Sequence, residues 1–375
     1  MSMFARNEFN MAGRQRGLTI VEILVAVTLS LILLAGVSQL FISSKRTYEV
    51  QDGLSRLQEN GRFAVDYLAR HVRMAGYMGC LSNSSLITMY NNLNNAAGFA
   101  NNFSIGIEGF EANGTSPGDA YTITAENPAP SGSAAGWSAA LDADLVGRVL
   151  PGTDVIVVRN AAPSSVALVS PFNDSAQIFV SNPNDLLIGD ILMVTDCQKA
   201  SVFQATNVQS TGFGTNAVHG QANMTPGNSN SVWGSDQEYT EGGEIMKSEM
   251  RVFYVGQGAA GGPALFQRSL RNAGGGVVQL VSDELVEGVE NMQVLYGEDT
   301  NGDRTADTYR EADNVADWSQ VVSARVSLLV RSPENSLPEP ETNTFDVGGV
   351  DVDPVDDRRL RQVFTTTITL RNRAS

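Results

Sequence analysis

The chain has 375 residues, of which 42% are hydrophobic and 18% are charged, and this composition is too apolar for a disordered protein. Its 41 acidic and 25 basic residues give a formal charge of -16, so the surface potential opposes binding to nucleic-acid phosphates. Two histidines and two cysteines are too few for the usual zinc clusters, and they make acid-base catalysis an unpromising function.

The first predicted element is an apolar segment, residues 18–42 (LTIVEILVAVTLSLILLAGVSQLFI), in which Glu22 is the one ionisable side chain. A hydrocarbon core needs about 20 apolar residues, so this segment is long enough to cross a membrane. Arg6, Arg14 and Arg16 precede it, and this positive flank would keep the N-terminus in the cytoplasm and the rest of the chain outside. An ordinary cleaved secretory signal has a shorter apolar region followed by a small-residue cleavage site, and the segment shows neither feature.

Glu22 argues against a plain single-pass anchor. A carboxylate near the start of an apolar span is costly in lipid unless it stays at the interface or finds a cationic partner. If the chain were cut between Gly17 and Leu18, a positive amine would appear four residues before Glu22. That amine would lie one helical turn away, or within reach on a neighbouring subunit. Cleavage would therefore create the counter-charge for Glu22.

Residues 17–22, GLTIVE after a short basic leader, resemble the class III signal of type IV prepilins. The resemblance implies that a prepilin peptidase removes residues 1–17 and that Leu18 becomes N-methylated. It also implies that Glu22 sets the register of the subunit within a helical filament.

The next element is a helical stripe of apolar or small residues. From Leu54 onward these residues recur at spacings of three and four: Leu57, Gly61, Ala64, Leu68, His71 and Ala75. Together with the apolar segment, they predict a helix from about Leu18 to Met78, about 90 Å long and loosened at Gly53 and Gly61. We assign residues 18–79 to this spine helix, with 18–42 as transmembrane segment and later filament core. Gly76 and Gly79 supply the stop.

Residues 80–375 are predicted to form a β-rich globular head. Residues 81–136 and 204–238 are polar, and we expect them to be mostly loops, with a short strand at 121–125. Clearer strands are predicted at 154–159, 177–180, 190–195, 250–255, 264–270, 277–280, 292–296, 321–330 and 362–370. Their alternation favours an antiparallel sheet. The predicted fold class is α+β, a long spine helix packed on an antiparallel head with long loop insertions.

Three segments carry a closer resemblance, to PilW-like minor pilins: residues 60–80, 285–309 and 363–373. A protein of this kind is implied to prime assembly of the type IV pilus and to sit in a minor pilin complex at the tip. Its implied partners are other minor pilins, the major pilin and a PilY-type tip adhesin. It would reside in the inner membrane with a periplasmic head and then in the extracellular pilus, serving adhesion and twitching motility.

Two alternatives stay open. A minor pseudopilin of a type II secretion system shares the leader, Glu22 and the spine helix, so only the head segments argue against it. A membrane-tethered binding module or enzyme would need neither the cleavable signal nor Glu22. No motif of a hydrolase, nucleotide-binding protein or metalloprotease occurs in the chain, so we expect no enzyme activity and no required cofactor.

Cys80 and Cys197 are predicted to form a disulfide, because both lie in the part of the chain placed outside the cytoplasm and their number is even. A crosslink closing a loop of just over a hundred residues would stabilise the head by about 4–5 kcal/mol in the chain-entropy model. The alternative is two independently buried thiols.

The sharpest candidate ligand site is the sequence DTNGDRTAD, residues 299–307. Oxygen donors at this spacing suit Ca²⁺, and they are Asp299, Asn301, Asp303, Asp307 and the Thr305 carbonyl. The alternative is a solvated Asn-Gly hairpin turn. Arg304 and Arg310 occupy the positions where an EF-hand has Gly and Glu, so the motif is incomplete.

Three further features receive no functional role. His71 is expected to be a core or interface histidine of the stripe, and His219 to be solvated in its polar loop. The acidic and basic residues of the segment 351–361 are expected to form a charged, exposed surface.

Overall fold

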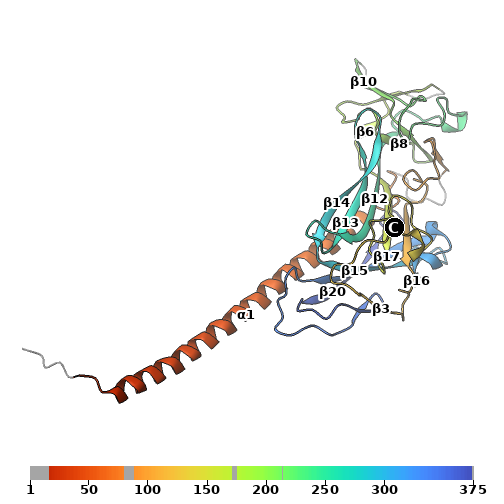
Figure 1. Ribbon diagram of the computed structural model, residues 1–375. Helices are drawn as coiled ribbons and strands as arrows, with labels where there is room; N and C mark the ends of the chain where they lie inside the picture. The colour runs from red at the N-terminus through yellow and green to blue at the C-terminus, as the bar shows by residue number, and fades with distance from the viewer. Residues whose placement is uncertain (1–16, 80–87, 171–174, 213, 374–375) are drawn as a thin grey trace, which may run out of the picture. The chain divides into compact units, whose positions relative to one another are not determined.

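The computed structural model describes residues 17–79, 88–170, 175–212 and 214–373. The chain divides into two compact units, Met1–Gln51 and Asp52–Ser375. A single helix, α1 (Ile20–Val72), begins in the first unit and ends in the second (Figure 1). The remainder of the second unit, the head, consists of several mostly antiparallel sheets. The predicted α+β class is confirmed.

Helix α1 ends at Val72, so the predicted end at Met78 was wrong. Beyond Val72 the backbone hydrogen bonds change to the tighter 3-10 type. The N–H groups of Met74 and Ala75 donate to carbonyls only three residues earlier in the chain. Gly76 then takes a positive φ of 70°, and its N–H leaves the helix to bond the Arg159 carbonyl at 2.9 Å. The helix therefore ends before the predicted glycine stop, and Gly76 makes the left-handed turn that follows it.

Gly53 and Gly61 do not loosen α1, contrary to the prediction, since the helix is continuous through both. Both glycines are buried, and they permit close packing. A Cβ at Gly61 would overlap the ring of Phe364, and one at Gly53 would overlap the Ser336 side chain. These positions need glycine because another segment approaches the helix backbone there.

The largest sheet of the head has ten strands. They are β1 (Thr88–Asn91), β2 (Ile107–Ala112), β4 (Trp137–Ser138), β5 (Val155–Ala161), β6 (Val166–Ala167), β8 (Ile191–Thr195), β9 (Lys199–Gln204), β12 (Glu244–Gln257), β13 (Pro263–Asn272) and β14 (Val278–Glu287). The main order is β1-β9-β8-β12-β5-β2-β4; in addition, β6 and β13 pair with β12, and β14 pairs with β13. Because β12 pairs with four strands, it connects all parts of this sheet.

Three smaller sheets complete the head. A four-stranded antiparallel sheet has the order β16-β15-β17-β20. Its strands are β15 (Val289–Glu298), β16 (Thr308–Arg310), β17 (Val321–Arg331) and β20 (Arg361–Thr369). The first three-stranded sheet contains β7 (Gln177–Val180), β10 (Asn207–Thr211) and β11 (Gly214–Val218), and the second contains β3 (Ala120–Thr122), β18 (Phe345–Val347) and β19 (Val350–Asp353).

The described residues also form four short 3-10 helices, and two pairs of the described strands run parallel. The helices are η2 (Ala134–Gly136), η3 (Ser235–Gln237), η4 (Ala312–Asn314) and η5 (Trp318–Gln320). The parallel pairs are β1 with β9 and β3 with β19.

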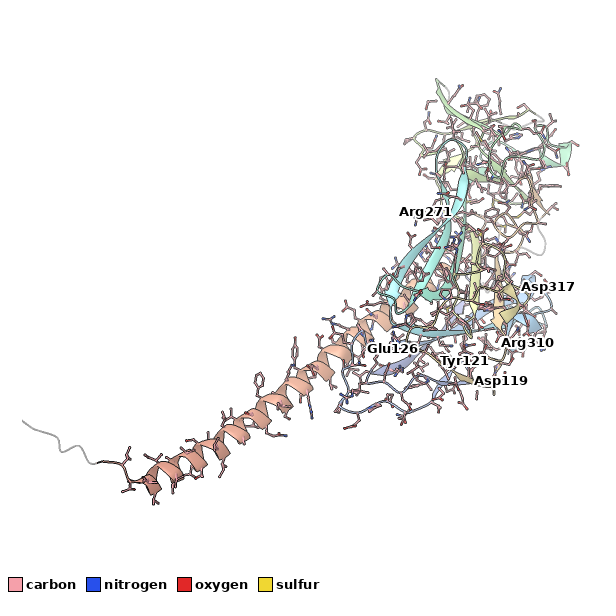
Figure 2. All side chains as sticks on the ribbon, in the orientation of Figure 1. Asp119, Tyr121, Glu126, Arg271, Arg310 and Asp317 are labelled. Atoms are coloured by element: carbon pink, nitrogen blue, oxygen red, sulfur yellow. The ribbon has the colours of Figure 1, made fainter. Side chains whose placement is uncertain are left out.

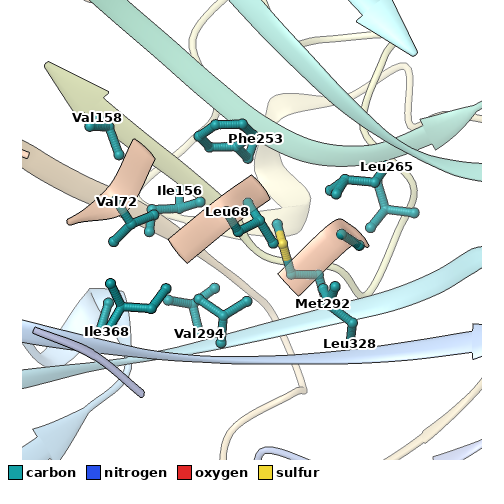
Figure 3. Packing of buried hydrophobic residues seen from close by; sticks show 14 of the residues in the cluster. Leu68, Val72, Ile156, Val158, Phe253, Leu265, Met292, Val294, Leu328 and Ile368 are labelled. Atoms are coloured by element: carbon teal, nitrogen blue, oxygen red, sulfur yellow. The ribbon is translucent and has the colours of Figure 1, made fainter. Parts of the chain in front are cut away.

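The main core forms where the last turns of α1 pack between two sheets (Figure 3). Leu68 of the predicted stripe and Val72, which the prediction did not include, are fully buried against one side formed by β5 and β12 and another formed by β15, β17 and β20. Figure 3 labels Ile156, Val158 and Phe253 from the first side. Burial of one such aliphatic side chain contributes about 1.5–3 kcal/mol. The predicted stripe therefore anchors the head on its helix.

Both segments predicted to be mostly loops contain strands that the sequence did not reveal. Strand β2, within residues 81–136, is largely buried, and β10 with β11 form a hairpin within residues 204–238. The hairpin is rich in Asn, Gln, Ser and Thr, so it lacks the apolar alternation by which strands are found. Pairing of β11 with β7 stabilises this hairpin, although its residues have little strand propensity of their own.

Candidate functional site

The N-terminal candidate site is the first turn of α1. Leu18 and Thr19 precede the helix, and Leu18 is 73% exposed. The Thr19 N–H and hydroxyl each donate to Glu22 Oε2 at 3.1 Å, and the Glu22 N–H donates back to Thr19 Oγ1 at 3.3 Å. This reciprocal arrangement is a capping box, which satisfies otherwise unpaired N–H groups at the start of a helix. It holds the Glu22 carboxylate at the N-terminal end of α1, directly after the predicted cleavage position Gly17–Leu18.

The apolar half of α1 lies in the first unit, and every side chain from Leu18 to Ile42 is exposed. The helix contains an 18-residue window with a mean hydropathy of 2.6, of which none is buried. A helix that is apolar all round requires an apolar environment outside its own chain. This observation fits membrane anchoring.

The two histidines are packed against aromatic rings. His71 lies 4.6 Å from the Tyr67 ring and 6.0 Å from the Phe253 ring, between centroids. Partial burial and the nearby Arg251 lower the pKa of His71 to about 4. The expectation that His219 is solvated was wrong, because it is fully buried and stacks on Trp233 at 4.0 Å. Burial lowers its pKa to about 4 as well, so both rings are neutral at pH 7.

The five candidate calcium donors lie in one loop, between β15 and β16, which form an antiparallel hairpin. Asp299 accepts the Gly302 N–H at 2.7 Å through one carboxylate oxygen and the Arg304 N–H at 2.8 Å through the other. Asp303 accepts the Thr305 N–H at 2.8 Å. The turn of this loop is therefore stabilised by hydrogen bonds from its own backbone N–H groups to its own carboxylates.

The remaining donors of this loop also bond one another. The Asn301 amide donates to Asp307 at 2.8 Å, and the Thr300 hydroxyl donates to the same carboxylate at 2.8 Å. Arg310, at the end of β16 (Figure 2), pairs with Glu298 at 2.9 Å. Across the described ranges, no group of three or more His, Cys, Asp or Glu side chains is arranged to hold a metal ion. Calcium binding here stays a prediction.

Cys197 follows β8 and takes a positive φ of 69°, a left-handed conformation that is uncommon for a residue with a side chain. It is disulfide-bonded. Cys80 lies outside the described residues, so its pairing with Cys197 stays a prediction.

The segment predicted as a charged exposed surface instead contributes to a buried ion network. Glu290 of β15 bonds Arg331 of β17 at 3.0 Å and Arg361 of β20 at 2.7 Å, and all three side chains are at most 4% exposed. Asp357 bonds Arg361 at 2.8 Å. Removal of one member of such a network typically costs about 3–5 kcal/mol, because it leaves a buried charge unpaired. The network ties β15, β17 and β20 of the four-stranded sheet together.

A buried carboxyl pair escaped the sequence analysis. Asp154 accepts the backbone N–H groups of Ala112 and Val294 at 3.0 and 2.8 Å. Glu111, which is 3% exposed, lies beside it. Burial and the Asp154 charge raise the pKa of Glu111, and burial raises that of Asp154 against the effect of its two N–H donors. Nothing in the sequence signals this pair, because β2 and β5 bring the two residues together only in the folded head.

An open cleft of about 890 Å³ is a second feature that the sequence did not reveal. Leu187 and Ile188 expose 60% and 44% of their surfaces at this cleft. Asn272 also lines this cleft, and its amide donates to the Ile188 carbonyl at 2.9 Å. All twelve described lining residues are uncharged.

Two family models match the chain. Residues 13–38 match the prokaryotic N-terminal methylation motif, and residues 252–372 match PilW, type IV pilus-assembly protein W. The second match contains the complete four-stranded sheet that packs on α1. No curated protein and no solved structure matches the chain. The predicted resemblance to a PilW-like type IV pilin is confirmed by these two matches.

Proposed function

We propose that this chain, PilW-like by its family matches, is a minor pilin that primes type IV pilus assembly and sits in a minor pilin complex at the pilus tip. It is inserted in the inner membrane with its head in the periplasm until assembly, and a prepilin peptidase cleaves it before Leu18. Its companions are other minor pilins, the major pilin and a PilY-type tip adhesin.

The observation that carries this proposal is the position of the PilW match. It covers residues 252–372, which supply β15, β17 and β20 to the core around Leu68 and Val72. The match therefore covers the part of the head that holds the spine helix. In a subunit whose helix enters a filament, this contact transmits force between filament and head.

The same match favours a pilus over a type II secretion system. A pseudopilin would share the methylation motif, the Thr19–Glu22 capping box and the apolar half of α1, so these features do not discriminate. The head sheet does, because its sequence resembles a pilus-assembly protein.

We further propose a structural role without catalysis and without a required cofactor. Both histidines are neutral and packed against aromatic side chains, and the buried Glu290 is paired with two arginines. In the described chain these groups stabilise packing, and they do not face the uncharged cleft at Leu187.

The test is recovery of the mature protein from membranes and from sheared pili, followed by mass spectrometry of its companions. We expect companion minor pilins and a PilY-type protein in both fractions, and far fewer pili after deletion of the gene. The Glu22→Ala variant is the matched control, because it should remain in the membrane fraction alone. Recovery with secretion-system components and none in sheared pili would contradict the proposal.

A further inference from the structure

Strand β20 forms an edge of the four-stranded sheet, in the order β16-β15-β17-β20 (Figure 1). Its inner side pairs with β17 over nine residues without a register shift. Its sequence from Gln362 to Thr369 is QVFTTTIT, which is uncharged and consists mostly of β-branched residues. Such a strand has the composition of one that is paired on both sides.

The bonds at the two ends of β20 define which backbone groups point outward. The Leu370 N–H donates to the Val322 carbonyl, and the Leu360 carbonyl accepts the Ser332 N–H. Even-numbered residues therefore bond β17, because antiparallel pairs alternate between bonded and unbonded positions. The N–H and C=O groups of the odd-numbered residues point away from β17: Val363, Thr365, Thr367 and Thr369. Within the described ranges, no other segment forms a hydrogen bond with these backbone groups.

The other long edge strand of the head is protected and β20 is not. Strand β14 carries Asp283, Glu284 and Glu287, and charged side chains are a usual means of preventing edge pairing. The other described edge strands are shorter: β10 has five residues, and β1, β3, β4, β6, β7, β16 and β18 have two to four each. Strand β20 is also rigid, because Phe364 packs against α1 at Gly61 and Thr365 bonds Ser327 at 2.9 Å.

We propose that β20 is a docking edge that receives an extended, uncharged β-strand from a different subunit of the pilus assembly. The unpaired backbone groups require an extended backbone as their partner, and the uncharged side chains require a strand without buried charge. This inference rests on the proposed function.

Strand β20 of a second copy does not fit this edge. Two copies would pair β20 antiparallel about a two-fold axis, which would turn the α1 segments Leu57–Val72 in opposite directions. Two helices that begin in the same membrane cannot run in opposite directions. Pairing with β20 of a second copy is therefore excluded, and we assign the partner strand to another polypeptide.

The test compares hydrogen exchange in peptides covering residues 361–370 between the full-length mature protein in detergent and the same protein in sheared pili. We expect the amides of Val363, Thr365, Thr367 and Thr369 to exchange at least tenfold more slowly in pili. Peptides from the charged edge β14 are the internal control and should exchange equally in both states. Equal exchange of the β20 amides in both states would overturn the edge pairing alone, whereas absence of the chain from pili would overturn the proposed function as well.

A matched pair of variants tests the same edge in cells. Thr365→Pro removes one outward N–H without removing a bond to β17, and we expect at least tenfold less of it in sheared pili. Thr365→Val keeps the N–H but loses the hydroxyl, and it should reach wild-type amounts. Normal incorporation of the folded proline variant would contradict the proposal. If the proline variant does not fold, hydrogen exchange of the wild-type protein decides whether β20 is paired. A crosslink from Thr367 to a second copy of the chain would show that the partner is misassigned.

Discussion

The two halves of α1 have the same secondary structure but opposite surroundings. From Ile20 to Ile42 every side chain is exposed and most are apolar, whereas from Asp52 to Val72 only one stripe is buried. The first half can be stable only in lipid or among other apolar helices, and the second half is stabilised by its own head. One helix thus combines an intermolecular and an intramolecular apolar surface, and each can be tested separately.

The largest effect is expected at the beginning of the first half. Replacement of Gly17 by Phe should abolish cleavage, because the family motif implies that the peptidase needs a small residue before the scissile bond. The full-length chain should then stay in the membrane, as measured by mass spectrometry of the N-terminus. Gly17→Ala is the control and should retain processing; normally processed Gly17→Phe would contradict the assignment.

The next effect concerns Glu22, whose predicted partner is the new amine of Leu18 on a neighbouring subunit. Glu22→Ala should leave membrane insertion intact but remove the protein from sheared pili, because an unpaired amine in an apolar environment is costly. Thr19→Ala removes the capping box but leaves the Glu22 carboxylate. This variant therefore separates the role of Glu22 in helix capping from its role as a charge partner. If both variants are lost from pili equally, helix capping and not the charge is the cause.

A paired truncation tests the two halves directly. Leu68→Ala should destabilise the head by about 2–5 kcal/mol, because Leu68 is fully buried in the main core. Leu31→Ala, at a position 60% exposed in the first half, should leave the unfolding midpoint of the head unchanged. Denaturant unfolding of the full chain in detergent measures both. Equal destabilisation would show that the halves are not independent.

The connection of the second half to the head should depend on the predicted Cys80–Cys197 disulfide. Cys197→Ser or reductant should lower the stability of the head by about 2–4 kcal/mol, because the unfolded chain gains freedom. Pilus number should fall with it. Reductant should have no further effect on the Cys197→Ser variant. Thiol labelling that finds both wild-type cysteines free, without reductant, would disprove the crosslink.

The smallest effect lies inside the head, at Glu111. Its pKa is raised by burial, so the folded state holds a proton that the unfolded state releases above its ordinary pKa of 4.5. Stability contributed by this group is therefore present below that value and is lost as pH rises above it. Glu111→Gln should be more stable than wild type by about 1–2 kcal/mol at pH 8. The advantage should vanish at pH 4; an advantage independent of pH would assign the effect to packing instead.

Much of the protein could be predicted from the sequence where the signal is local. The apolar segment, the GLTIVE motif and the stripe from Leu57 to Leu68 depend on residues within a few turns of one another. Strands such as β7 and β17 could also be predicted, because the composition of each segment alone indicates a strand. The capping of Glu22 by Thr19 is equally local, since the two residues are three apart.

What only the tertiary structure decided depends on residues far apart in the chain. The glycines of α1 look like flexible points in sequence, but Gly61 is required because the Phe364 ring lies against it. Arg361 looks like a surface charge until β20 places it against Glu290. Glu111 of β2 and Asp154, which directly precedes β5, come together only when these two strands pair. A local pattern reports the environment that a segment needs, but the identity of its neighbour depends on how distant strands pair.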